Sequence, residues 1–211
     1  MVPARRAFTF IELLVVFSLI AILTGMTLPA VTAVQSAAKR TACQANLRQV
    51  AVALIAYAGD YHDQLPAERN HGCDDPERSP AWFARLPDYV DQQRADGGIF
   101  RCPSYRYVPS GRFANATPKS YKMNDYLDAV SGRQHYRLGT WASESDIVCF
   151  ADGIAKETGQ GQWGHLLPSG IDAGRHRGVV NVLYLDGHGL AMRSDDRHGG
   201  GIHALTWFGP R

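Results

Sequence analysis

The chain has 211 residues, of which 45% are hydrophobic and 20% are charged, which suffices for one modest globular core and an accessory element. Its 22 Lys and Arg residues nearly balance its 20 Asp and Glu residues, and the formal net charge is +2. This balance argues against a strongly basic surface, so we expect no nucleic-acid partner.

The first predicted element is a membrane-spanning helix over residues 8–28. This run is apolar except for one charged residue, Glu12. About 20 helical residues cross a hydrocarbon core of about 30 Å. Arg5 and Arg6 precede the run, and Lys39 is the first basic residue after it. The positive-inside rule therefore predicts a single pass, with a cytoplasmic N-terminus and the rest of the chain outside.

Three interpretations are open for this N-terminal segment. A cleaved secretory signal would have an apolar region of only about 7 to 15 residues. A plain signal anchor leaves the carboxylate of Glu12 unexplained. The third interpretation starts from the sequence RRAFTFIELLVV, beginning at Arg5, which resembles the leader of type IV prepilins and type II secretion pseudopilins. It accounts for the basic pair, the small residue, the aromatic residue and the carboxylate together.

This resemblance assigns roles to three residues. In the family, a membrane peptidase cuts after a small residue, usually Gly, and methylates the new N-terminal Phe, leaving a Glu at the fifth mature position. Ala7, Phe8 and Glu12 stand at these positions, with Ala7 in place of the usual Gly. Residues 1–7 are thus predicted to be a prepilin leader, and their removal takes away two arginines and leaves a formally neutral mature chain.

Glu12 is predicted to be an assembly residue. A carboxylate at the middle of a membrane helix costs about 2.5 to 3.5 kcal/mol on translocon scales unless it meets a cation. The resemblance implies that Glu12 attracts the N-terminal ammonium group of Phe8 in a neighbouring subunit and so sets the axial register of a filament. A carboxylate hydrated at the membrane interface is the alternative.

Residues 29–58 are expected to continue the helix. Pro29 interrupts the apolar run, but a proline can kink a long helix without ending it. Apolar residues then recur every three to five positions, with basic and amide residues between them, as on an amphipathic helix. This part is expected to pack against a globular head formed by residues 59–211.

The head is expected to contain short strands and long loops. Gly, Pro, Asp and Asn punctuate it, and only residues 82–90 suggest a helical turn. Residues 66–98 and 154–175 match no pattern and are expected to be surface loops. The candidate strands are residues 99–102, 120–124, 147–151, 179–185 and 189–193. The last two predict a β-hairpin, residues 179–193, around an Asp-Gly turn.

The C-terminal part carries a second resemblance. His176 is followed, after nine intervening residues, by Asp186-Gly187-His188. This spacing resembles the signature of the prepilin-associated C-terminal domain, and residues 43–50, 100–104 and 147–153 are also similar to that family. The two resemblances imply an α+β, pilin-like fold, in which a long N-terminal helix packs on a small antiparallel β-sheet with long loops.

The four cysteines are Cys43, Cys73, Cys102 and Cys149. A head outside the cytoplasm permits disulfides, and four cysteines allow three full pairings. The family resemblance implies that Cys43 pairs with Cys102, which would tie the head to the helix and add about 2 to 4 kcal/mol of stability. Four buried free thiols are the alternative.

Neither catalysis nor a metal or other cofactor is expected. No His pair has the spacing of a zinc-hydrolase helix, and no GxSxG nucleophile elbow occurs. Backbone geometry alone explains the Asp and Gly of the predicted hairpin turn. A structural Ca²⁺ on loop residues such as Asp152, Glu157 and Asp172 is an alternative, although their spacing fits no calcium motif.

The function implied by the resemblance is structural, as a subunit of a type IV pilus-like filament or of a type II secretion pseudopilus. Its partners would be copies of itself or related pseudopilins, the prepilin peptidase and an inner-membrane assembly platform, with the head in the periplasm. The alternative is a membrane-anchored module outside the cytoplasm that binds a glycan or an exported substrate through exposed aromatic residues. Those aromatic residues are Trp82, Tyr105, Tyr107, Tyr126, Trp141, Trp163 and Trp207.

Overall fold

The fold comes from a computed structural model. It describes residues 9–67, 78–90, 98–106, 119–127, 137–139, 143–154, 165–166, 170–172 and 174–193. Three predicted site residues, Ala7, Phe8 and Cys73, lie outside the described residues. The cleavage site and one cysteine therefore stay predictions.

The chain divides into two compact units, residues 1–38 and 39–211. Helix α1 (Phe10–Asp60) begins in the first unit and ends in the second. Pro29 lies inside this helix, so the expectation that the helix resumes after the proline is correct. A proline removes one backbone hydrogen bond, and the bonds before and after it remain to hold the helix.

The first unit contains the apolar part of α1. An 18-residue window of the helix has a mean hydropathy of 2.3, and none of that window is buried. Large apolar side chains are exposed from Phe10 to Leu28. A helix that is apolar on all sides needs an apolar environment. Among the described residues, α1 is the one helix long and apolar enough to cross a membrane.

The second unit contains a five-stranded sheet with strand order β3-β1-β2-β4-β5. Its strands are β1 (Tyr121–Asn124), β2 (Val148–Asp152), β3 (His165–Leu166), β4 (Val179–Tyr184) and β5 (Gly189–Arg193). The helical segments after α1 are α2 (Trp82–Arg85), η1 (Leu86–Tyr89), η2 (Gly98–Phe100), η4 (Asp125–Leu127) and η5 (Glu144–Asp146). Strands β1, β2, β4 and β5 pair antiparallel, and the two-residue β3 pairs parallel with β1. The long helix and this small sheet confirm the α+β pilin-like fold.

One predicted strand, residues 99–102, is wrong. Residues 98–100 instead form the 3₁₀ turn η2. Gly98 has φ 52°, a left-handed conformation that bends the chain, and Pro103 has no N–H to offer a neighbouring strand. The apolar pattern of these residues therefore reflects burial of Phe100 in the core and not pairing in the sheet.

The C-terminal hairpin lies where the sequence places it. Strands β4 and β5 pair from Val179 opposite Arg193 to Leu183 opposite Gly189. Gly187 in the turn has φ 89°, a conformation that favours glycine, and its N–H donates to the carbonyl of Tyr184 at 3.0 Å. The Asp-Gly sequence is thus explained by the backbone of the turn.

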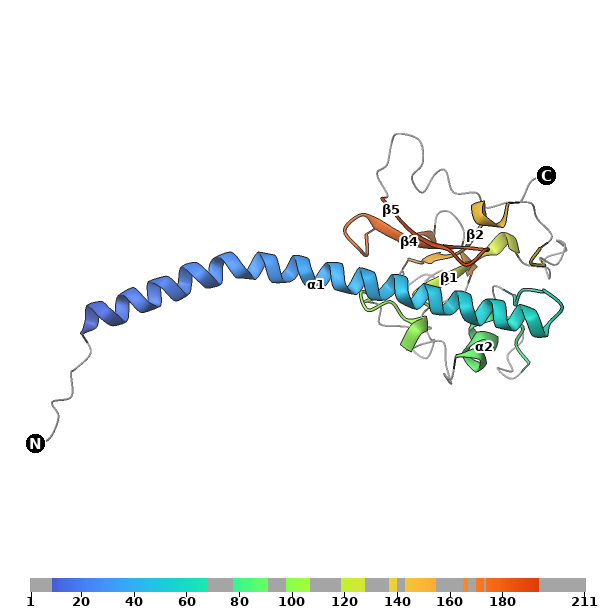
Figure 1. Cartoon of the computed structure of the whole chain (residues 1–211), viewed down its shortest axis with the longest axis horizontal. Helices are drawn as coiled ribbons and strands as arrows, with labels where there is room; N and C mark the ends of the chain where they lie inside the picture. The colour runs from blue at the N-terminus through green and yellow to red at the C-terminus, as the bar shows by residue number, and fades with distance from the viewer. Residues whose placement is uncertain are drawn as a thin grey trace, which may run out of the picture. The chain divides into compact units, whose positions relative to one another are not determined.

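The core of the second unit forms between the C-terminal part of α1 and the sheet. In Figure 1 this part of the helix, coloured cyan, lies between the strands and α2. One continuous cluster contains residues from all three, including Leu47 and Leu54 of α1, Trp82 of α2, Phe150 of β2 and Leu183 of β4. The apolar face of the amphipathic part of the helix is therefore buried against the head.

The segment from residue 66 to residue 98 is not only surface loop, contrary to expectation. Trp82 and Leu86 are fully buried. The Trp82 ring meets the ring of Phe150 edge to face, with centroids 5.1 Å apart, and lies 6.2 Å from that of Phe100. A short helix with one fully buried aromatic residue supplies apolar area that its sequence pattern does not reveal.

The packing of α1 on the head predicts a contrast between two neighbouring helix positions. Leu54 is 2% exposed and Val52 is 64% exposed. Leu54→Ala should lower the free energy of unfolding by about 2 to 5 kcal/mol, because it leaves a cavity in the core. Val52→Ala, the matched control, should change it by less than about 0.5 kcal/mol. Chemical denaturation of the full chain in detergent measures both, and equal effects would contradict this packing.

Candidate functional site

The N-terminus of α1 is closed by a reciprocal pair of side chains. The backbone N–H and the hydroxyl group of Thr9 both donate to Oε2 of Glu12, each at 2.8 Å. The backbone N–H of Glu12 donates in turn to Oγ1 of Thr9 at 3.2 Å. This arrangement is a capping box, which satisfies two backbone N–H groups at the start of the helix.

The capping box gives Glu12 a role within its own chain. Sequence reasoning considered only a neighbour's ammonium group or water as partners of this carboxylate and missed Thr9. The signal was present, because Thr-x-x-Glu before an apolar run is the pattern of a capping box. Phe8 lies outside the described residues, so its ammonium group as a partner of Glu12 stays a prediction.

The C-terminal signature separates into two structural roles. His176 is buried and precedes β4, and its carbonyl accepts the N–H of Val179 at 3.3 Å across a turn with two left-handed residues. Asp186 lies in the turn at the other end of β4, where its Oδ1 accepts the N–H of His188 at 3.0 Å and contacts its Nδ1 at 2.6 Å. The spacing of nine residues therefore corresponds to one strand with its flanking turns.

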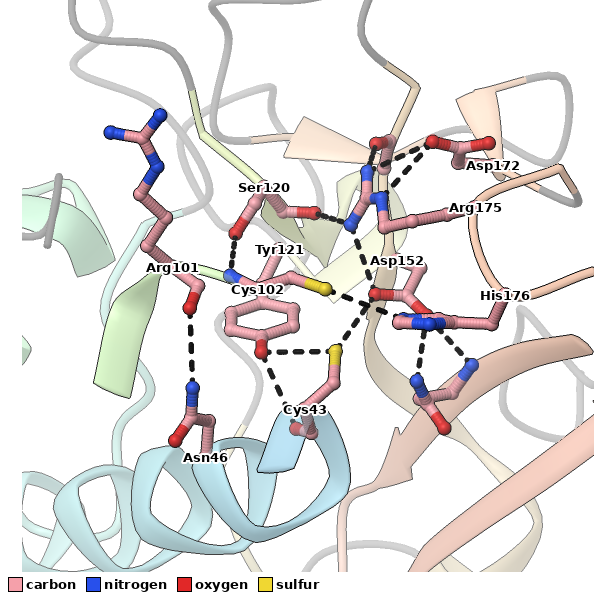
Figure 2. Close-up of polar contacts among 12 residues, drawn as sticks. Cys43, Asn46, Arg101, Cys102, Ser120, Tyr121, Asp152, Asp172, Arg175 and His176 are labelled. Carbon is pink, nitrogen blue, oxygen red and sulfur yellow. Dashed lines mark hydrogen bonds and ion pairs between the residues drawn. The ribbon is translucent and has the colours of Figure 1, made fainter. Parts of the chain in front are cut away.

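Four side chains from separate segments meet inside the second unit (Figure 2). Cys43 comes from α1, Cys102 follows η2, Asp152 ends β2 and His176 precedes β4. All four residues are buried, and their sulfur, nitrogen and carboxylate atoms lie within 4.8 Å of one another. No short motif joins these four positions, so sequence reasoning did not find them as a group.

Direct contacts link the members of this four-residue cluster. The Cys43 thiol lies 3.4 Å from Oδ1 of Asp152. The Cys102 sulfur lies 3.3 Å from Nε2 of His176, and that nitrogen is 3.7 Å from Oδ2 of Asp152. The side chains are therefore already gathered around one point.

The predicted disulfide is not formed in the structure. Cys43, Cys102 and Cys149 are free thiols, and all three are buried. The fold does bring Cys43 and Cys102 together, as the family resemblance implies, whereas Cys149 packs in the apolar core apart from the four-residue cluster. Pairing of Cys43 with Cys102 stays a prediction, and the structure adds two further partners for their sulfur atoms.

Asp152 is the charged member of the cluster and is completely buried. Nη1 of Arg175 donates to its Oδ1 at 3.0 Å. The backbone N–H and Nδ2 of Asn181 donate to its Oδ2 at 2.9 and 3.0 Å. A buried carboxylate is tolerated only with a charged partner and hydrogen-bond donors, and these two residues supply both.

Arg175 connects the cluster to the surrounding loops. Its side chain is 2% exposed, and its guanidinium group also binds Asp172 at 3.1 Å and the carbonyl of Ser120 at 2.9 Å. A further nitrogen donates to the carbonyl of Gly153, and the guanidinium lies over the ring of Tyr105 at 4.7 Å. Sequence reasoning placed Arg175 in a surface loop, and no local pattern marks it as a core cation.

Two groups hold the cysteines in place. The hydroxyl group of Tyr121 donates to the Cys43 sulfur at 3.1 Å and lies 3.3 Å from its carbonyl. The backbone N–H of Cys102 donates to Oγ of Ser120 at 2.8 Å. Tyr121 begins β1 and Ser120 immediately precedes it, so the entry into this strand positions the sulfur atoms.

Burial and neighbouring charges shift the pKa values in this region in opposite directions. A hydrogen bond with Cys43, followed by His176 and Arg175, lowers the pKa of Cys102 against the effect of burial. Burial raises the pKa of Cys43. Burial also raises the pKa of Asp152, and the guanidinium of Arg175 opposes that shift. Cys102 is therefore the thiol more readily ionised.

Lys122 is, after Arg175, another buried basic residue beside the cluster. Its side chain is 1% exposed and crosses Gly153, where a Cβ atom would come within 2.4 Å of the lysine Cδ. Only glycine fits under this lysine, which explains the Asp-Gly sequence at the end of β2. Burial, with a smaller effect of Arg175, lowers the pKa of Lys122 to about 7.

Two family models match the chain. One is described as a prokaryotic N-terminal methylation motif and covers residues 3–28, and the other is described as a protein of unknown function (DUF1559) and covers residues 32–96. The first match falls on the predicted cleavage site and on the apolar start of α1. The chain is a type IV pilin-like protein.

The pilin-like character implies processing by a prepilin peptidase, assembly into a filament and a membrane-anchored N-terminal segment. Neither match reaches the C-terminal signature at His176 and Asp186, so that resemblance stays a prediction. No curated protein and no solved structure matches the chain.

The structure of this pilin-like protein also bears on the calcium hypothesis. Asp152 and Asp172 are both paired with Arg175, so each of the two described carboxylates already has a guanidinium partner. Glu157 lies outside the described residues. The two carboxylates are thus explained by an ion-pair network within the head.

The aromatic residues of the binding-module hypothesis divide into two groups. Trp82 and Tyr105 are buried and Tyr126 is partly buried, so none of these three contributes to an exposed flat surface. The others, Tyr107, Trp141, Trp163 and Trp207, lie outside the described residues. In the part of the pilin-like head that the structure describes, these aromatic residues serve packing.

The buried lysine predicts a pH dependence of stability. Because the pKa of Lys122 is about 7 in the folded protein and 10.5 ordinarily, the unfolded chain binds more protons between these values. The free energy of unfolding should therefore rise with pH across this window. In Lys122→Met the free energy of unfolding should rise less with pH. The stability of the variant relative to the wild type should be greatest below the folded-state pKa of about 7.

Thermal denaturation of the full-length pilin-like chain in detergent, repeated over this pH window, measures the difference. Lys39 is exposed, so Lys39→Met is a control for the loss of one positive charge. Parallel pH profiles of the wild type and Lys122→Met would contradict the buried, neutral amine.

Proposed function

We propose that the protein is a structural subunit of a type IV pilus or of a type II secretion pseudopilus, cleaved after Ala7 and methylated on Phe8. The observation that carries this proposal is the methylation-motif match at residues 3–28, at the start of a helix whose apolar surface is exposed. An exposed apolar helix is unstable in water, and membrane lipid or the helices of neighbouring subunits would cover it.

The proposal places the protein in the inner membrane as a single-pass precursor, with the N-terminus in the cytoplasm and the head in the periplasm. The arginines before the apolar run support this orientation. Cleavage after Ala7 removes them, so the mature chain is formally neutral. Neutral subunits pack side by side without long-range charge repulsion.

Glu12 has two roles in this proposal, one within its own chain and one between neighbouring subunits. Within the chain its Oε2 accepts both hydrogen bonds from Thr9, and it is the oxygen engaged among the described contacts. The carboxylate can therefore keep the helix start closed while its second oxygen attracts the ammonium group of Phe8 on a neighbour. Away from water this attraction is stronger than at a surface.

A structural role, and not an enzymatic one, is part of the proposal. The four-residue cluster is the richest set of reactive side chains among the described residues, and its members are between 0% and 3% exposed. A substrate has to reach catalytic groups, which this burial opposes. Their contacts with α1 and with two strands support a role in holding the head together.

Two variants separate the assembly role of Glu12 from its capping role. Glu12→Gln keeps an oxygen that can accept from Thr9 but loses the charge, and it should lower the yield of crosslinked filament at least about tenfold if the ion pair contributes about 1.4 kcal/mol or more. Thr9→Ala breaks the capping box but keeps the charge, and it should assemble nearly normally. Filaments sheared from cells that carry the assembly machinery, crosslinked and quantified, give the readout.

The opposite pattern would contradict the assembly role. If Glu12→Gln assembled normally and Thr9→Ala did not, the carboxylate would serve the helix start alone. Detergent-extracted monomer of each variant should be present in equal amounts, which controls for membrane insertion.

A further inference from the structure

The four-residue cluster offers two sulfur atoms, one imidazole nitrogen and one carboxylate oxygen to a single point (Figure 2). We propose that Cys43, Cys102, Asp152 and His176 bind a structural Zn²⁺ ion that fastens α1 to the head. Each ligand comes from a different segment of the second unit. One ion would thus join a helix, a loop, the end of β2 and the turn before β4.

The distances between the ligand atoms agree with a tetrahedral ion. Bonds of about 2.0 to 2.3 Å to oxygen, nitrogen and sulfur give ligand-to-ligand edges of about 3.3 to 3.8 Å. Two such edges in the structure measure 3.4 Å (the Cys43 sulfur to Oδ1 of Asp152) and 3.3 Å (the Cys102 sulfur to Nε2 of His176), and the four ligand atoms all lie within 4.8 Å of one another. Binding therefore requires little movement of these side chains.

The surrounding charges balance the proposed ion. Two thiolates and the carboxylate of Asp152 carry three negative charges, while Zn²⁺ supplies two positive charges and Arg175 a third. The charges of these completely buried groups then sum to zero, which lowers the cost of placing them away from water. The second carboxylate bound to Arg175, that of Asp172, is 22% exposed and stays outside this sum. The positive charge of Arg175 is the one that offsets the third negative charge of the ligands, which is consistent with its position beside Asp152.

Neighbouring side chains hold two of the proposed ligands in position through hydrogen bonds. Arg175 and Asn181 hold Asp152, and Tyr121 donates to the Cys43 sulfur at 3.1 Å. Such partners fix the orientation of metal ligands. His176 differs from these ligands: with Nε2 bound to the metal its ring proton lies on Nδ1, a buried atom with no hydrogen-bond partner among the described residues, so the surrounding contacts orient Asp152 and Cys43 but not this imidazole.

The donor set selects the metal. Thiolate sulfur is a soft ligand that Ca²⁺ and Mg²⁺ do not favour, whereas two Cys with His and a carboxylate suit tetrahedral Zn²⁺. A Cys43–Cys102 disulfide would consume the same two sulfur atoms, since an oxidised pair has no thiolate to offer. Zinc binding and the disulfide therefore exclude each other, and one sample can decide between them.

The first test uses the wild-type full chain in detergent, so that it depends on no variant. Metal content by plasma mass spectrometry should show one zinc per chain. After reduction and removal by a chelator, Co²⁺ should bind with the visible spectrum of a tetrahedral thiolate site, and Zn²⁺ should displace it at one equivalent. Absence of both stoichiometric zinc and the cobalt spectrum in reduced protein would overturn the proposal.

The second test assigns the ligands. Cys43→Ala and His176→Ala should each weaken Co²⁺ binding more than the roughly 10- to 100-fold typical of outer-shell changes. Cys149→Ala removes a buried thiol outside the cluster and should leave binding unchanged. His176→Cys should still bind Co²⁺, with stronger thiolate absorption from a third sulfur. This gain separates a metal ligand from a residue that only supports folding.

Two other outcomes would also overturn the proposal. Equal loss of Co²⁺ binding in Cys149→Ala and Cys43→Ala would show that the metal is not bound by the cluster. The protein can also be mapped as isolated, without reductant or chelator. If Cys43 were linked to Cys102 in nearly every chain of that sample, the two sulfur atoms would belong to a disulfide.

Discussion

The burial of one carboxylate, that of Asp152, is the constraint on which the second unit depends. An isolated charge in a protein interior costs several kcal/mol unless a partner and hydrogen bonds compensate for the lost water. The fold meets this cost with donors from two segments, the turn that carries Arg175 and strand β4 with Asn181. The end of β2 and the start of β4 are thereby fixed, and the two cysteines and His176 surround the same atoms.

Helix α1 couples two environments that require different sequences. Its first part is apolar on all sides, as lipid or a bundle of neighbouring helices demands, and its last turns bury one face against the head. The capping box of Thr9 and Glu12 closes its start and pairs backbone N–H groups that a helix leaves without an intrahelical partner. Cys43 and Leu47 anchor the second part of the helix in the core of the head.

The parts of the fold that could be predicted from the sequence are those set by local signals. The apolar run, the helix beyond Pro29 and the Asp-Gly hairpin each follow from neighbouring residues. The packing around Trp82 and the cluster around Asp152 both join residues that are far apart in the chain, so no local sequence pattern predicts them. Disulfide pairing concerns cysteines alone and helical spacing concerns histidines alone, so neither pattern predicts a cluster that contains both residue types.

The N-terminus of the mature chain decides whether this is a filament subunit processed as a pilin. Intact-mass and N-terminal peptide mass spectrometry of the protein from membranes with an active prepilin peptidase should give a chain that begins at Phe8 and carries one added methyl group. A chain that keeps Met1 would contradict the proposal, because Glu12 would then have no neighbouring ammonium group at the required spacing. A chain cut near Ala30, as a secretory signal would be, would contradict it because Glu12 itself would be removed.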